Sequence, residues 1–247
     1  MVWAVGDGPD GDPEPNAVAR LIASRPVDRL LYLGDVYENG TRREYRDHYA
    51  PAYGKLDRVT SPTPGNHEWG EREEGYDPYW RENGLDTDPH YYSFELAGWQ
   101  LLSLNSEGDV SEDSEQVRWL REQLEEADGT CRIAFWHRSR YSAGENHGDD
   151  EELAPLWDTL AGRAAIVLTA HDHNMQRLEP RDGITAFVSG AGGSSHYPID
   201  DDYDGVAFSN DTDDGALRLV LRPTSASFAF IAADGRTLDS GTIPCRP

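Results

Sequence analysis

The chain has 247 residues and a formal net charge of −24 at pH 7, from 46 acidic and 22 basic side chains. This length suits one domain with a well-buried core, so we expect residues 1–247 to form a single domain. A surface this acidic repels nucleic acid and anionic membranes, which argues against long nucleic acid as a partner. No apolar stretch is long enough to cross a bilayer, so we expect no membrane-embedded segment.

In chain order, five short apolar runs each end in a polar residue. They predict strands at residues 2–5, 30–33, 59–64, 133–136 and 165–169. Continuous apolar runs are typical of strands buried on both faces. Their polar ends are then expected along one edge of the sheet, where open α/β sheets bind ligands.

Helical patterns alternate with these strands, and they are predicted at residues 17–24, 113–127 and 151–160. In the second helix, Asp113 is the expected N-cap, and Gln116 completes a capping-box pattern. Val117, Leu120 and Leu124 then share one face. Residues 91–104 read as a hairpin, and residues 184–243 as antiparallel strands. The order of elements therefore predicts a mixed α/β sandwich.

The chain has two cysteines, Cys131 and Cys245. They are either unrelated buried thiols or a disulfide that ties down the C-terminal tail, which would imply an oxidising compartment. A disulfide favours a secreted protein whose leader is absent from this chain. The cytoplasmic alternative fits an N-terminus that enters the first core strand with no leader pattern.

Lysine is almost absent, since Lys55 is the only one and every other basic residue is arginine. A GC-rich genome favours Arg codons over Lys codons. A salt-loving organism also favours acidic residues and avoids lysine. Both origins fit the composition.

The polar residues at the strand ends form an ordered set: Asp7, Asp35, Asn66 with His67, His137, and His171 with His173. Each of these residues alone is weak evidence for a functional site, because a Gly-Asp at a strand end is often only a turn and a single histidine is often structural. Together they supply carboxylate, amide and imidazole ligands, which suit Fe, Mn and Zn. The order of the set therefore predicts a metal site.

The motifs around these residues read Gly6-Asp7-Gly8, Gly34-Asp35-Val36-Tyr37, Gly65-Asn66-His67-Glu68, Trp136-His137-Arg138 and Ala170-His171-Asp172-His173. The set resembles the calcineurin-like metallophosphoesterase superfamily, and within it the purple acid phosphatase-like branch of the secreted bacterial type. The resemblance implies a four-layer αββα sandwich of two mixed sheets flanked by helices. It also implies a phosphoesterase that hydrolyses monoesters or diesters with water or hydroxide activated by two metal ions, either Fe, Mn or Zn.

The resemblance also implies the ligand sets. Asp7, Asp35 and His173 would bind the first metal. Asp35 would bridge to a second metal, whose other ligands would be Asn66, His137 and His171.

The remaining implied roles are catalytic. His67 would face the phosphate, stabilise developing charge and protonate the leaving group. Glu68 would orient His67 as an outer carboxylate. His147, in the loop after the fourth strand, is expected to contact the substrate or donate a proton.

Three positions depart from the family pattern. The common motif has His two residues after the first Asp, whereas position 9 is Pro. The purple acid phosphatase branch has a Tyr ligand three residues after the bridging Asp, whereas Tyr37 comes only two residues after Asp35. Ala170 stands where a Gly usually precedes the His pair, which is a small change. Tyr37 is still expected to reach the metal, through a different turn.

Two further functions stay open. A metal-binding module of this fold that has lost catalysis is one, although retention of Asn66, His67 and the other motif histidines argues against it. A nucleotide-directed phosphodiesterase is the other, since the acidic surface disfavours long nucleic acid but not a nucleotide. In every case the expected ligand is a small phosphorylated substrate. The sequence does not indicate the oligomeric state.

Overall fold

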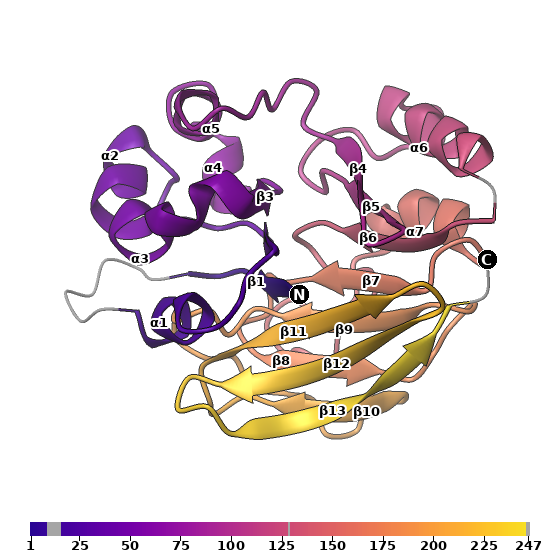
Figure 1. Ribbon diagram of the computed structural model, residues 1–247. Helices are drawn as coiled ribbons and strands as arrows, with labels where there is room; N and C mark the ends of the chain where they lie inside the picture. The colour runs from indigo at the N-terminus through magenta and orange to yellow at the C-terminus, as the bar shows by residue number, and fades with distance from the viewer. Residues whose placement is uncertain (9–15, 128, 246–247) are drawn as a thin grey trace.

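Two mixed β-sheets pack face to face with helices on both outer sides (Figure 1). The computed structural model describes residues 1–8, 16–127 and 129–245, so Pro9 lies outside the described residues. The expected αββα sandwich is confirmed. Within the described residues, no helix combines the length and the apolar character needed to cross a membrane.

The first sheet has the strand order β13-β12-β11-β1-β2-β3. Its strands are β1 (Val2–Val5), β2 (Arg29–Tyr32), β3 (Thr60–Pro62), β11 (Gly215–Arg222), β12 (Ser225–Ala232) and β13 (Thr237–Pro244). The first three are parallel to one another, and the last three are antiparallel. All polar ends of β1–β3 therefore lie at one edge.

The second sheet has the order β10-β8-β9-β7-β6-β5-β4. Its strands are β4 (Tyr92–Leu96), β5 (Trp99–Ser103), β6 (Cys131–Phe135), β7 (Ile166–Thr169), β8 (Met175–Leu178), β9 (Thr185–Ser189) and β10 (Val206–Asn210). The predicted β4–β5 hairpin is confirmed, turning at Ala97 and Gly98 with φ of 53° and 80°. Residues 184–243 are not wholly antiparallel, because β9 runs parallel to β7.

The expectation that all five strand ends share one sheet edge is wrong. β1, β2 and β3 belong to the first sheet, whereas β6 and β7 belong to the second. The residues that follow these strands meet where the carboxyl ends of the two sheets face each other.

Alternating side chains along the central strands explain the layers. In β1, Val2 and Ala4 are buried between the sheets, whereas Trp3 and Val5 are buried on the outer side. The outer face of the first sheet packs on α1 (Ala17–Ala23) and on the aromatic side chains of the helical segment 42–82. Apolar strands buried on both faces are expected for a sheet covered on both sides.

Apart from β3, the segment 42–82 is built mainly of short helices: α2 (Arg42–Glu44), a π-helix (Tyr45–Tyr49), α3 (Ala50–Tyr53), a 3₁₀-helix (Gly54–Val59), α4 (Asn66–Trp69) and α5 (Tyr76–Glu82). Figure 1 shows α1–α5 gathered apart from α6 and α7. Tyr45, Tyr49 and Trp80 pack ring against ring in this segment. Its aromatic residues therefore serve mainly as core.

On the other side, α6 (Glu115–Glu126) and α7 (Ala154–Leu160, preceded by a 3₁₀ turn, Glu151–Leu153) cover the second sheet. The N-cap predicted for α6 is wrong. Ser114, and not Asp113, accepts the Val117 N–H at 3.2 Å. The Gln116 side chain holds the backbone of Asn105, with its Oε1 2.7 Å from Asn105 N.

A disulfide joins Cys131 at the start of β6 to Cys245 after β13, with Cα atoms 5.7 Å apart. Of the two alternatives for the cysteines, the bridged one therefore holds. Because β6 and β13 belong to different sheets, the bond also links the two sheets.

Candidate metal centre

The structure brings the strand-end residues together between the carboxyl ends of the two sheets. Asp7 follows β1, Asp35 follows β2, and Asn66 begins α4 just after β3. His137 follows β6, and His171 opens the loop after β7. The φ angles of Asp7, Asp35 and His171 are 55°, 66° and 71°. Positive φ is uncommon for residues other than glycine, and it clusters at functional sites.

One group of potential ligand atoms surrounds the Tyr37 hydroxyl. This oxygen lies 3.0 Å from Asp7 Oδ1, 3.3 Å from Asp35 Oδ2 and 2.7 Å from His173 Nε2. The other Asp7 oxygen, Oδ2, accepts the His171 N–H at 2.8 Å, so Oδ1 alone faces this group. Tyr37 therefore reaches the first ligand set although it comes only two residues after Asp35.

A second group surrounds His137 Nε2. This atom lies 3.0 Å from Asn66 Oδ1, 3.1 Å from His171 Nδ1 and 3.4 Å from Asp35 Oδ2. The ligand atoms of Asp35, His137 and His171 all fall within 4.8 Å of one another. Asp35 Oδ2 thus belongs to both groups, while Asp35 Oδ1 accepts the His67 N–H at 3.1 Å.

The imidazole orientations fit a cation. His137 Nδ1 lies 2.8 Å from Leu33 O, and His173 Nδ1 lies 2.7 Å from Ser195 O. A carbonyl accepts only from an N–H, so Nδ1 is protonated and the lone pair of a neutral ring is on Nε2. The Nε2 of His137 faces the acceptors Asn66 Oδ1 and Asp35 Oδ2, and the Nε2 of His173 faces the Tyr37 hydroxyl and the acceptor Asp7 Oδ1. Such a set is repulsive without a positive charge between its members, so the residues present fit metal ions.

Burial and neighbouring charges both shift the pKa values of the candidate ligands. Asp7 and His137 are fully buried, and Asp35 is only 1% exposed. Burial would raise the pKa of Asp35, but His137 and His67 hold it well below its usual range. Burial and His137 lower the pKa of His171 to about 2, so this ring is neutral and ready to bind a metal. Burial opposes the charged form of His137, yet Asp35 raises its pKa to about 10, so a proton and a metal compete for Nε2.

Two glycines allow the backbones to meet at the centre. A Cβ on Gly65 would lie 2.1 Å from Asp35 Oδ1. A Cβ on Gly34, whose φ is +96°, would lie 2.8 Å from His137 Nδ1. Any larger residue at either position would displace a candidate ligand.

His67 lies at the rim of the centre. Its Nε2 is 3.7 Å from Asp35 Oδ2, and its Nδ1 is 2.5 Å from Glu38 O. The expectation that Glu68 orients His67 is corrected, because Glu38 O holds the imidazole. The buried Glu68 carboxylate instead accepts the N–H groups of Asp35 and Gly65, at 3.0 and 3.1 Å. Glu68 therefore supports the backbone at Asp35 and Gly65.

Two aromatic rings cover the outer side of the histidine ligands. His147 stacks on His171 with ring centroids 3.7 Å apart, which places it beside the candidate ligands. Tyr197 stacks on His173 at 3.9 Å and lies 5.5 Å from His147. Tyr197 lies in a loop outside every motif, so no sequence pattern indicated it.

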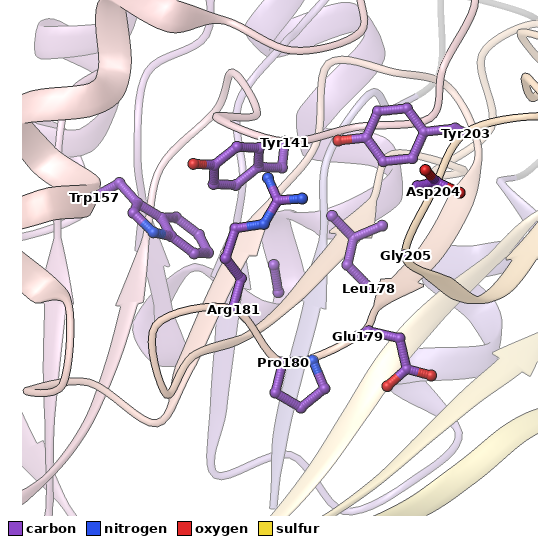
Figure 2. Close-up of a pocket in the computed structure, with 10 residues that line it drawn as sticks. Tyr141, Trp157, Leu178, Glu179, Pro180, Arg181, Tyr203, Asp204 and Gly205 are labelled. Carbon is purple, nitrogen blue, oxygen red and sulfur yellow. The ribbon is translucent and has the colours of Figure 1, made fainter.

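A separate cavity of about 190 Å³ lies between α7, the end of β8 and residues 203–205 (Figure 2). Its walls are largely aromatic and aliphatic, with Tyr141, Trp157 and Leu178 among them. None of the candidate ligands lines it. This cavity is therefore distinct from the metal centre.

The fold and the clustered carboxylate, amide and imidazole groups are those of a candidate metal-binding protein, and comparison of sequences gives the family. The family model described as calcineurin-like phosphoesterase matches residues 2–175. This chain belongs to the calcineurin-like phosphoesterase family.

Among curated proteins, the chain is similar to purple acid phosphatase 22 of Arabidopsis thaliana, with 24% identity over 183 residues, 64% of this chain and 41% of the relative. It is also similar to tartrate-resistant acid phosphatase type 5 of Mus musculus, with 27% identity over 143 residues, 53% of this chain and 43% of the relative. The expected purple acid phosphatase-like branch is confirmed. The chain spans about two fifths of the length of these relatives.

Among solved structures, a purple acid phosphatase from seeds of yellow lupin (Lupinus luteus) has a TM-score of 0.81 at 17% identity, covering 99% of this chain and 53% of that one. GAP50, the anchor in the inner membrane complex of Plasmodium, has a TM-score of 0.80 at 14% identity, covering 100% and 89%. The same fold thus occurs in a phosphatase and in an anchor, so the fold alone does not decide the function.

Proposed function

We propose that this chain hydrolyses small phosphate monoesters or diesters at a dinuclear metal centre. The observation that carries the proposal is the position of Asp35 Oδ2, which lies 3.3 Å from the Tyr37 hydroxyl and 3.4 Å from His137 Nε2. One carboxylate oxygen within reach of two separate ligand groups suits two ions that share a bridging ligand. The first ion would be held by Asp7, Asp35, Tyr37 and His173, and the second by Asp35, Asn66, His137 and His171.

Bound there, Fe, Mn or Zn ions would polarise the phosphoryl oxygens and make water a nucleophile at neutral pH. The residues of the chain have the remaining tasks. Asp35 is held in place by the His67 and Glu68 contacts described above. His67 is at the rim, where its Nε2 can donate a proton to the leaving alcohol. His147, stacked on His171, is the second candidate to contact the substrate.

The test is metal content and turnover of the reconstituted protein on aryl phosphate monoesters and diesters. We expect two transition-metal ions per chain and hydrolysis of at least one ester class. Asp35→Asn should lose both the metal and the activity. The matched control is Asp239→Asn, since Asp239 is a partly buried carboxylate paired with Arg177, 2.7 Å from Arg177 Nε, on β13. Fewer than one ion per chain after reconstitution, or full activity in Asp35→Asn, contradicts the proposal.

A catalytically impaired module is the second candidate, because the fold also occurs in an anchor protein. Full metal content without turnover on any phosphate ester would favour it. A nucleotide-directed phosphodiesterase would be distinguished by a preference for nucleotide diesters over simple aryl diesters. The acidic surface disfavours longer nucleic acid in either case.

We propose in addition that residues 1–247 act as one domain and that the protein is exported. The apolar core between the sheets contains residues from both ends of the chain, such as Val2 and Ile243, which supports a single unit. The disulfide supports an oxidising compartment. Two free thiols in protein isolated from its native source would contradict export.

A further inference from the structure

Asp172 is a buried carboxylate that neither ligand set uses. It stands between the candidate ligands His171 and His173, and it is only 1% exposed. An ionised carboxylate at such a depth needs hydrogen-bond donors. Those donors come from the loop that carries His147.

The loop 142–148 wraps around this carboxylate. Ser142 Oγ donates to Asp172 Oδ2 at 2.5 Å, and His147 N–H donates to Asp172 Oδ1 at 3.3 Å. Between them, the loop backbone packs directly on the carboxylate, since a Cβ on Gly144 would lie 2.1 Å from Asp172 Cγ. Asp172 thus contacts the loop at its start, its middle and its end.

The direction of the Ser142 hydrogen bond follows from its other partners. Ser142 Oγ accepts the Gly144 N–H at 3.0 Å and an amide hydrogen of Gln176 at 2.9 Å. Both of its acceptor positions are therefore occupied, so its single hydrogen is donated to Asp172. Both oxygens of Asp172 therefore face donors, so asparagine, with a single acceptor oxygen, would place its amide NH2 against either Ser142 Oγ–H or the His147 N–H.

The two flanks of the loop are also fixed. At one end, the Tyr141 ring packs edge-on against Trp157, with ring centroids 4.8 Å apart. The Arg181 guanidinium carbon lies 3.9 Å from the centroid of the Tyr141 ring (Figure 2). At the other end, Glu145 N–H donates to Pro198 O at 3.0 Å, beside Tyr197. The loop therefore has a single anchored position, with the His147 ring stacked on His171.

We propose that Asp172 is a positioning residue that holds the loop 142–148 against the metal centre and so sets the place of His147. This inference rests on the proposed function for its kinetic consequence, although the anchoring itself is independent of it. Asp172 acts through His147 and does not touch the substrate. Preorganisation of this kind matters because a displacement of about 1 Å can cost about a hundredfold in rate.

The first experiment needs no activity. Amide hydrogen exchange would be measured in the protein as purified and after chelation, for the wild type, Asp172→Asn and Gly144→Ala. We expect exchange of residues 143–148 to accelerate at least about tenfold in both variants, with β6 and β7 unchanged. Asp239→Asn is the control and should leave the loop protected. Equal loop exchange in the wild type and in both variants overturns the proposal, and Gly144→Ala keeps the test valid if Asp172→Asn does not fold.

The second experiment is a double-mutant cycle on kcat/KM with Asp172→Asn and His147→Ala. If Asp172 acts through His147, each single variant loses about ten- to a hundredfold and the double variant loses no more than His147→Ala alone. Losses that multiply would show a merely structural role and overturn the proposal. If the wild type has no esterase activity, the proposed function fails, and the hydrogen-exchange result still decides whether Asp172 anchors the loop.

Discussion

At the scale of single residues, the centre depends on side chains whose two ends have separate tasks. Asp35 Oδ1 accepts a backbone N–H while Oδ2 faces both ligand groups. His137 and His173 each use Nδ1 on a carbonyl and leave Nε2 for the metal. Because one end fixes the orientation of the other, the backbone helps to set the geometry of the candidate ligands.

Substitutions of the neighbours Asn66 and His67 are expected to change metal content and turnover in different ways. Asn66 Oδ1 lies 3.0 Å from His137 Nε2, so Asn66→Ala should lose metal and slow alkyl and aryl phosphates alike. His67→Ala should keep both ions and lose about 10²–10⁴-fold on alkyl phosphates, whose leaving groups need a proton. Its loss on activated aryl phosphates should be smaller. Metal content and turnover on both substrate types check this, and equal slowing in His67→Ala would count against a leaving-group acid.

The motif order was sufficient to predict the residues that meet at the centre, because each follows an apolar strand. It was not sufficient for Tyr197 or for the anchoring contacts of Asp172, which come from loops with no periodic pattern. The role of Glu68 was also misjudged, because its partners are backbone N–H groups of Asp35 and Gly65 that no residue type reveals.

At the scale of elements, continuous apolar runs predicted the central strands, and helical patterns with capping and first-turn signals predicted the helices. Sequence could not assign strands to sheets. β1 pairs with β11, more than 200 residues later, while β6 and β7 lie in the other sheet. Such pairings depend on long-range packing. The N-cap of α6 was placed one residue early because Asp113 and Ser114 are both good caps.

The 3₁₀-helix Gly54–Val59 contains a carboxylate whose titration should be visible in stability. Burial raises the pKa of Asp57 to about 6, against a hydrogen bond from the Tyr79 hydroxyl at 2.8 Å. The folded protein therefore binds this proton more tightly than the unfolded chain, and its contribution to stability is lost as the pH rises from about 4 to about 6.

Asp57→Asn stays neutral, so the melting temperature of this variant should gain on the wild type as the pH rises from 4 to 7. Thermal unfolding of the two proteins at matched metal concentration is the measurement. A difference that does not change with pH would mean that Asp57 has an ordinary pKa.

At the scale of the whole molecule, the net charge of −24 is unfavourable for a compact state, because carboxylates repel one another across the surface. Salt shortens the range of this repulsion from about 10 Å at 0.1 M to about 3 Å at 1 M. The melting temperature should therefore rise between low and molar potassium chloride. A flat or falling trend would favour codon bias as the origin of the lysine-poor composition.

The disulfide and the metal centre lie at opposite ends of one strand, β6, which starts at Cys131 and leads to His137. Each candidate ligand group takes residues from both sheets, so an ion bound there would be a cross-link between the sheets, as the disulfide is. The distance along the strand is about 20 Å, so with ions bound the two sheets would be joined near both ends of β6. In the chain-entropy model, closing a loop of 114 residues contributes about 4–5 kcal/mol to the free energy of unfolding. Each tenfold rise in free metal would add about 1.4 kcal/mol per saturated site to the same free energy.

Because the disulfide and the candidate metal centre are far apart, their contributions to the free energy of unfolding should add to within about 0.5 kcal/mol. Denaturant unfolding of the protein with and without chelator, in the wild type and in a Cys131→Ser, Cys245→Ser variant, measures the four states. A loss on chelation that depends on the disulfide would show that strain at one end of β6 is transmitted to the other.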